Sequence, residues 1–141
     1  MSDQAARTDI DRSASSEEAA TNVERGIDEP LATLVADWLT LEEAAERLGV
    51  STSRVEVLAR EHELAVAGAR GGWLPALFFD GSEIVKGLPG TLTLLFDAGY
   101  DPHESIQWLY TADDSLPGRP VDALGENRGT EVRRRAQALG F

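Results

Sequence analysis

The chain has 141 residues, of which 42% are hydrophobic, so it suits one or two small domains with a compact core. It contains no cysteine, which excludes disulfides, thiolate metal sites and a cysteine nucleophile. Its formal net charge of -12 opposes the positive footprint of most nucleic-acid-binding proteins, and no long segment of the chain is basic.

The first 36 residues are predicted to form a disordered acidic tail. Up to about Leu31 they are rich in Ser, Ala, Asp, Glu and Thr, and they contain no aromatic residue. Hydroxyl groups available to a kinase belong to Ser2, Thr8, Ser13, Ser15, Ser16 and Thr21. Composition alone favours a plain solvating tail. These first residues lack the apolar core of a secretory signal, and no apolar run could cross a bilayer, so a cytoplasmic location is expected.

Residues 40 to 60 show the pattern of two helices joined by a tight turn. Apolar residues at helical spacing lead into this pattern and predict a short helix or packing segment; they are Leu31, Leu34, Val35, Trp38 and Leu39. Gly49 supplies the permissive backbone of the turn. The residues expected to pack between the two helices are Ala44, Ala45, Leu48, Val50, Val55 and Leu58. The pattern indicates a helix-turn-helix, which commonly places its second helix in the DNA major groove.

The outward face of the second helix is the candidate DNA-binding surface. On a helical wheel Val55, Leu58 and His62 point to the core. Opposite and beside them lie the predicted contact residues Thr52, Ser53, Arg54, Val57 and Arg60. Hydroxyl and guanidinium groups bond phosphates or base edges, whereas the carboxylate of Glu56 on the same face repels phosphates. An ordinary solvated helix surface is the alternative interpretation.

Two short strands are predicted next, at 64–68 and 73–79, around the turn Ala69-Arg70-Gly71-Gly72. Together they would form a wing. Pro75 cannot donate a ladder hydrogen bond, so the second strand is expected at an edge, short or interrupted. Arg70 is a candidate contact to the minor groove or the DNA backbone, and a hairpin turn with an exposed arginine explains it equally well.

The remaining residues, from Gly81, show mainly helical patterns. The first expected helix begins at Pro89 and ends at Gly99, with Leu88, Leu92, Leu95 and Phe96 on one face. A second helix is capped by Asp101 and Glu104, and a loop at 113–118 and a short segment at 120–124 follow it. A closing helix has Val132, Ala136 and Leu139 on one side. The aromatic residues are expected in the core. The cluster at 133–135 suits a helix C-terminus, with Asp122 or Glu126 as partners.

Nothing in the sequence predicts an enzyme or a metal site. His62 and His103 have no second histidine or cysteine at ligand spacing. No nucleophile elbow, Walker loop, zinc signature or dinucleotide fingerprint is present. No cofactor is therefore expected.

Several segments, in this order, resemble the actinobacterial winged helix-turn-helix DNA-binding proteins that are substrates of a membrane serine/threonine kinase. The resemblance covers about residues 38 to 141. It is carried by the helix-turn-helix at Leu41 to Val50, P-A-L-F-F (Pro75 to Phe79), V-K-G-L-P-G-T-L-T-L-L (Val85 to Leu95), D-A-G-Y (Asp97 to Tyr100), W-L-Y-T (Trp108 to Thr111), R-P-V-D-A-L (Arg119 to Leu124) and E-V-R-R-R-A-Q-A (Glu131 to Ala138).

This resemblance implies DNA binding that is switched off when a threonine of the tail is phosphorylated. The tail itself does not align by motif, and Thr8 and Thr21 are the two candidate acceptors. The C-terminal stretch is also similar to the toxin-binding domain of Xre-type antitoxins, which keeps open an alternative function as a protein-interaction module.

The sequence thus predicts a mainly α protein with three parts. They are a disordered acidic tail (1–36), a winged helix-turn-helix with a small two-stranded wing (37–80), and a C-terminal helical domain (81–141). The expected function is a transcriptional regulator or nucleoid-associated factor. Its expected partners are double-stranded DNA, a serine/threonine kinase and a protein bound by the C-terminal domain.

Overall fold

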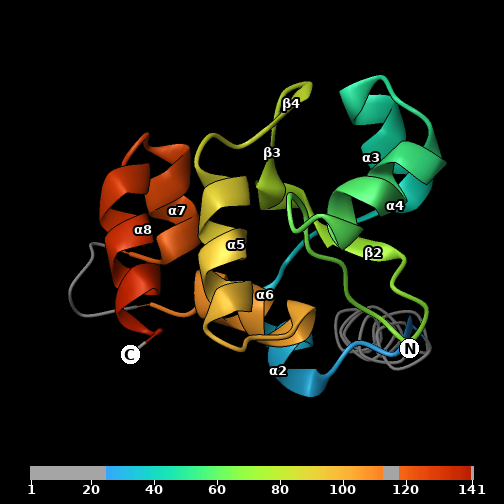
Figure 1. Ribbon diagram of the computed structural model, residues 1–141. Coiled ribbons are helices and arrows are strands. Elements are labelled where there is room, and N and C mark those ends of the chain that lie inside the picture. Colours follow the sequence, from blue (N-terminus) through green and yellow to red (C-terminus); the bar gives the residue numbers. More distant parts are fainter. Residues whose placement is uncertain (1–24, 113–117, 141) are drawn as a thin grey trace, which may run out of the picture.

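Seven α-helices and two small antiparallel sheets make up the computed structural model over the residues that it describes, 25–112 and 118–140 (Figure 1). The helices are α2 (Glu29–Leu34), α3 (Leu41–Leu48), α4 (Thr52–Arg60), α5 (Leu88–Asp97), α6 (Pro102–Tyr110), α7 (Pro120–Gly125) and α8 (Gly129–Ala138). The strands are β1 (Trp38–Thr40), β2 (Trp73–Pro75), β3 (Phe79–Asp80) and β4 (Glu83–Ile84), with the 3-10 turn η1 (Ala76–Phe78). The predicted mainly helical fold class is confirmed.

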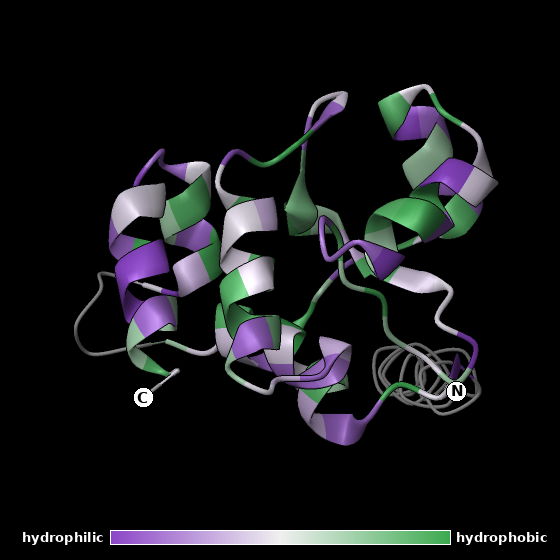
Figure 2. Cartoon of the chain, in the orientation of Figure 1, coloured by the Kyte–Doolittle hydropathy of each residue, from purple (hydrophilic) through white to green (hydrophobic). Residues whose placement is uncertain are grey.

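The helices α3 and α4 lie with β2 at one end of the molecule, and α7 and α8 lie at the other (Figure 1). Between these ends, α5 packs against both α6 and α8. Figure 2 shows long hydrophilic bands on α8 and mostly neutral or hydrophobic residues along α5. The α3–α4 pair is therefore not covered by the last two helices.

Side-chain caps define the start of both helices in the helix-turn-helix. The Thr40 hydroxyl accepts a hydrogen bond from the Glu43 N–H at 3.0 Å, and the Glu43 carboxylate accepts one from the Thr40 N–H at 2.8 Å. This capping box satisfies two backbone donors at the start of α3. The helix ends at Gly49, whose φ of 71° is left-handed. The Ser51 hydroxyl then caps α4 by accepting from the Arg54 N–H at 3.1 Å.

The contact between α3 and α4 follows the predicted apolar pattern, with one exception. Ala44 and Val55 have no exposed surface, and Ala45 and Leu58 are also buried. Val50, in contrast, is 39% exposed and does not fill the corner of the turn. Its N–H returns to the Ala45 carbonyl at 3.0 Å, which closes the helix end. The expectation that Val50 packs in the turn is therefore wrong.

The predicted wing is corrected in its pairing. β2 pairs antiparallel with β1, a strand from before the helix-turn-helix, with Thr40 opposite Trp73 and Trp38 opposite Pro75. The segment 64–68 contributes only the single bridge between Ala67 and Trp73. The turn after it is present, but its expected strand is not, because Trp73 exchanges hydrogen bonds with Ala67 and the next residue on that edge of β2 is Pro75, which has no N–H to donate. β2 ends at Pro75, as the missing donor of proline predicts.

A second hairpin joins β3 to β4, with Phe79 opposite Ile84. Its two-residue turn is Gly81-Ser82, between the paired residues Asp80 and Glu83, and Gly81 has a φ of 64°. A glycine suits the first central position of a hairpin turn in which that residue alone has positive φ. The sequence analysis expected a strand to end at Phe79 and did not expect a second hairpin.

The C-terminal half has the predicted core with three corrections. Buried residues of α5 and α8 are Leu88, Leu92, Leu95, Val132 and Ala136. Phe96, expected on the same face, is 51% exposed, and Leu139 is also exposed. The ring of His62 stacks on Phe96 with centroids 3.7 Å apart. His62 follows the end of α4 with a φ of 62°, so it does not continue the buried face of that helix.

The predicted cap of α6 is confirmed. The Asp101 carboxylate accepts from the Glu104 N–H at 2.8 Å, and the Glu104 carboxylate accepts from the Asp101 N–H at 3.0 Å.

Residues 25–36 belong to the packed body and not to a tail. At most 4% of the surface of Ile27, Leu31 or Val35 is exposed, and α2 packs against α6. The predicted tail of 36 residues is therefore too long, because Ile27, four residues before Leu31, extends the apolar spacing of the lead-in segment into it. Residues 1–24, 113–117 and 141 lie outside the described residues. The expected disorder of the tail and the expected loop at 113–118 therefore stay predictions.

The variant Gly49→Ala tests the turn of the helix-turn-helix. It should lower the free energy of unfolding by about 1 kcal/mol, because a side chain is strained at a φ of 71°. No atom lies within 4 Å of a Cβ built at Gly49, so the loss comes from the backbone alone. Gly125→Ala is the control, since that site is equally open and has no positive φ. Urea unfolding measures both, and equal stabilities would contradict this account.

Candidate nucleic-acid interface

The five residues predicted on α4 are brought together on a helix of nine residues. Thr52, Ser53 and Arg54 are exposed at its first turn, Arg60 is exposed at its last, and Val57 is half-buried. Ser53, Val57 and Arg60 share the face opposite Val55 and Leu58, and Thr52 and Arg54 flank it. The helix is about 13 Å long, which suits insertion into one stretch of major groove.

The helix α4 itself carries more positive than negative charge, on an acidic molecule. Arg54 and Arg60 supply two guanidinium groups, and Glu56 supplies one carboxylate. Among the described residues, no ion pair involves either arginine. Both charges therefore stay available to an anionic partner.

Arg70 lies in a separate place, the wing cleft. This cleft has a volume of about 630 Å³ and lies between the wing turn and the first residues of α3. Its lining residues are Arg25, Thr40, Leu41, Glu42, Ala69, Arg70, Gly72 and Trp73. The structure therefore places Arg70 beside α3, at the same end of the molecule as α4 (Figure 1).

Arg25 is a candidate residue that the sequence analysis missed, because it was assigned to the tail. Its guanidinium carbon lies 3.8 Å from the centre of the Trp73 ring. Its carbonyl accepts a hydrogen bond from the Ala69 N–H at 2.9 Å. The only sequence signal was indirect: Ile27 and Leu31, four residues apart, extend the apolar period to this segment.

The predicted phosphorylation sites and the arginine cluster at 133–135 lie away from α4 in the sequence. Thr8 and Thr21 lie outside the described residues. Arg134 and Arg135 are exposed on α8, and Arg135 falls in its last turn, as expected.

The predicted acidic partners of this arginine cluster are wrong. The carboxylate of Asp122 pairs with Arg119 at 2.8 Å, and that of Glu126 pairs with Arg128 at 2.8 Å. Both partners lie close in sequence to their carboxylates, so local pairing prevails.

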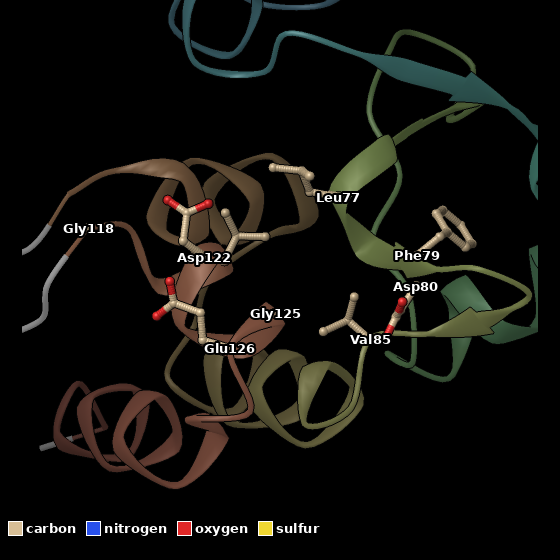
Figure 3. A pocket seen from close by; sticks show the side chains of 9 residues that line it. Leu77, Phe79, Asp80, Val85, Gly118, Asp122, Gly125 and Glu126 are labelled. Carbon is tan, nitrogen blue, oxygen red and sulfur yellow. The ribbon is translucent and has the colours of Figure 1, made fainter.

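A second hollow of about 580 Å³ lies between the β3–β4 hairpin and α7, and Figure 3 shows it from close by. We call it the hairpin hollow. Leu77, Phe79 and Val85 give it an apolar wall, and Leu77 is 47% exposed. Asp80 and Glu126 add carboxylates. The hollow therefore combines apolar surface with negative charge.

Asp122, which also lines the hairpin hollow, is held by a bidentate pair with Arg119. The Arg119 Nε and Nη2 donate to the two carboxylate oxygens at 2.8 Å and 2.9 Å. These hydrogen bonds lower the pKa of the Asp122 carboxyl. The same guanidinium lies 5.2 Å from the ring centre of Tyr110, whose pKa is raised by burial.

These features define the class of the protein. Two capped helices joined by a left-handed glycine, a strand on either side and a short wing turn form a winged helix-turn-helix. No helix within residues 25–112 and 118–140 has the length and apolar character that spanning a membrane requires.

The two halves of the chain match two domain families. Residues 30–79 match the family described as "DNA-binding protein Rv2175c, wHTH domain", and residues 85–140 match the "Rv2175c C-terminal domain of unknown function". The chain belongs to this Rv2175c family. The resemblance of its helix-turn-helix to such proteins is thereby confirmed.

A similar protein and a solved structure extend this result. The chain is 44% identical over 115 residues to "DNA-binding protein Rv2175c" of Mycobacterium tuberculosis (strain ATCC 25618 / H37Rv), covering 72% of this chain and 79% of that protein. It is also similar to the NMR structure of Rv2175c, with a TM-score of 0.66 and 41% identity. That match covers 74% of this chain and 82% of the other.

The variant Asp122→Asn tests the pair beside the hairpin hollow. Because the folded-state pKa is lowered, the pair stabilises the protein above the unfolded pKa of about 4. This contribution is lost as the pH falls through the folded pKa. The variant should therefore unfold at a lower urea concentration than the parent at pH 6. The difference between the two midpoints should shrink below pH 3.

Asp97→Asn is the control, because Asp97 is exposed and forms no ion pair with a described residue. A difference for Asp122→Asn that stays constant with pH would contradict the assigned role of the pair.

Proposed function

We propose that the protein binds double-stranded DNA through α4 and acts as a transcriptional regulator or nucleoid-associated factor, in a binding role and not a catalytic one. The observation that carries this proposal is the uncovered polar face of α4 on a domain that matches a DNA-binding family. A chromosomal target places this function in the cytoplasm.

In this proposal α4 lies in the major groove. Ser53, Val57 and Arg60 face the bases, because they lie opposite the buried side of the helix. Arg60 bonds a guanine or a phosphate, and Val57 contacts a thymine methyl group. Thr52 and Arg54 flank this face and bond the backbone. Arg70 contacts the backbone from the wing.

The binding is expected to be weak and sensitive to salt. Two arginines on α4 neutralise few phosphates, and the whole chain carries a formal net charge of -12. Since phosphate neutralisation supplies most non-specific affinity, added salt removes a large part of it.

Arg60→Ala tests the interface directly. If Arg60 contacts a phosphate, the variant should bind all duplexes more weakly and reduce the slope of log K against log salt by about 0.9. If Arg60 contacts a base, the variant should lose sequence preference, at a cost of about 1–3 kcal/mol at that position. Fluorescence anisotropy over a salt titration separates the two results.

The control is Arg134→Ala, which removes the same charge from an exposed site on α8 at the other end of the molecule. It should leave the salt slope unchanged. Arg60 would be removed from the interface if its variant showed neither effect.

A second candidate function is protein binding by the C-terminal half, favoured by the hairpin hollow. Its apolar wall beside Asp80 and Glu126 suits a partner segment that carries lysine or arginine among apolar side chains. Retention of such a partner, with no shift of any duplex at low ionic strength, would favour this function over DNA binding.

We further propose that a serine/threonine kinase controls DNA binding by modifying Thr8 or Thr21. Both threonines precede Arg25, whose backbone is bonded to Ala69 in the wing turn. A phosphate adds about two negative charges to a chain that is anchored at the DNA-binding end. Repulsion from the DNA backbone would then lower affinity.

The DNA affinities of the phosphorylated and the unmodified protein should differ most at low salt. The expected result is weaker binding after kinase treatment, with a difference that shrinks as salt screens the added charge. The variants Thr8→Ala and Thr21→Ala identify the acceptor, because only loss of the true acceptor abolishes the effect. Equal affinities before and after stoichiometric phosphorylation would contradict the proposed control.

A further inference from the structure

The wing cleft holds two arginines that come from distant parts of the sequence. Arg70 is exposed at the wing turn, and Arg25 lies where the described chain begins. Both line the same cleft of about 630 Å³. Glu42 is its single carboxylate among the described residues, so the cleft has a net positive charge.

Arg25 is fixed in this position by two contacts with the wing. Its guanidinium stacks on the ring of Trp73, with the guanidinium carbon 3.8 Å from the ring centre, and its carbonyl accepts from the Ala69 N–H at 2.9 Å. The chain beyond it also packs tightly, because a Cβ built at Gly26 would lie 2.5 Å from Ala69. A Cβ at Gly68 would lie 2.7 Å from the Arg25 carbonyl. Two glycines therefore permit this close approach.

The geometry favours an anion as the ligand. Stacking on an aromatic ring occupies the flat face of a guanidinium and leaves its N–H groups at the edge free to donate. These donors match the oxygens of a phosphate. Arg25 forms no ion pair with a described residue, and neither does Arg70.

We propose that the wing cleft binds a backbone phosphate of duplex DNA between Arg25 and Arg70. This inference rests on the proposed function and adds Arg25 as a DNA contact from outside the helix-turn-helix. The phosphate lies beside the first turn of α3, while α4 occupies the major groove. The contact is independent of base sequence, because it involves the DNA backbone alone.

The test is the salt dependence of binding by Arg25→Ala, Arg70→Ala and the double variant. Each single variant should reduce the slope of log K against log salt in part, and the double variant should reduce it by about 0.9 in total, because both arginines act on one phosphate. The loss should be equal for duplexes of different sequence. Arg134→Ala is the charge-matched control and should keep the parent slope.

Removal of the Glu42 carboxylate, in contrast, should strengthen DNA binding. Glu42→Gln should tighten binding about threefold at low salt, the order expected in water for one like charge a few ångströms away, since the Glu42 carboxylate lines the cleft. Glu46→Gln is the matched control, because Glu46 is exposed on the same helix and does not line the cleft. It should change the affinity less.

The outcomes separate this inference from the proposed function. If Arg60→Ala weakens binding but Arg25→Ala and Arg70→Ala keep the parent slope, the wing cleft is not a phosphate site and α4 still binds DNA. If the parent protein binds no duplex at low salt, both proposals are wrong. Circular dichroism establishes that each variant is folded, and Arg70→Ala, at an exposed turn residue, tests the cleft without disturbing the Trp73 stack.

Discussion

The close contact between α3 and α4 is the constraint on which the candidate interface depends. Ala44 and Val55 are completely buried where the helices meet, and an alanine allows the two backbones to approach closely. The left-handed Gly49 and the Ser51 cap fix the angle at which α4 leaves the turn. Since these contacts use one side of α4, its opposite side must face outward. The exposed polar face is thus a consequence of packing.

Charge distribution, more than net charge, determines whether an acidic chain can approach DNA. The Debye length is about 10 Å at 0.1 M salt, so distant charges contribute little at the binding surface. The helix α7, which carries Asp122, lies at the end of the molecule opposite α4 (Figure 1). Arg54 and Arg60 on α4, and Arg25 and Arg70 in the wing cleft, lie where a phosphate would come near. In the proposed complex, local attraction and weak overall repulsion together would make binding sensitive to salt.

The sequence predicted the features that depend on residues near one another in the chain. The turn at Gly49, the buried face of α4 and the cap at Asp101 each rest on spacings of a few residues, and the structure confirms them. The pairing of β1 with β2 was missed, because it joins segments on either side of the helix-turn-helix. The stack of Arg25 on Trp73 is equally non-local. Local patterns cannot select such partners, since many alternatives satisfy them.

The segment from Arg25 to Val35 contacts both the wing and the C-terminal helices. At its start it is bonded to Ala69 in the wing. Further along, α2 packs on α6, and the Asp28 carboxylate lies 3.5 Å from the His103 ring nitrogen. This segment is therefore held by both halves of the chain, and Arg25, where the described residues begin, lies at the wing. In the proposed control by phosphorylation, a charge added before Arg25 would repel DNA without requiring any change in the fold of the helix-turn-helix.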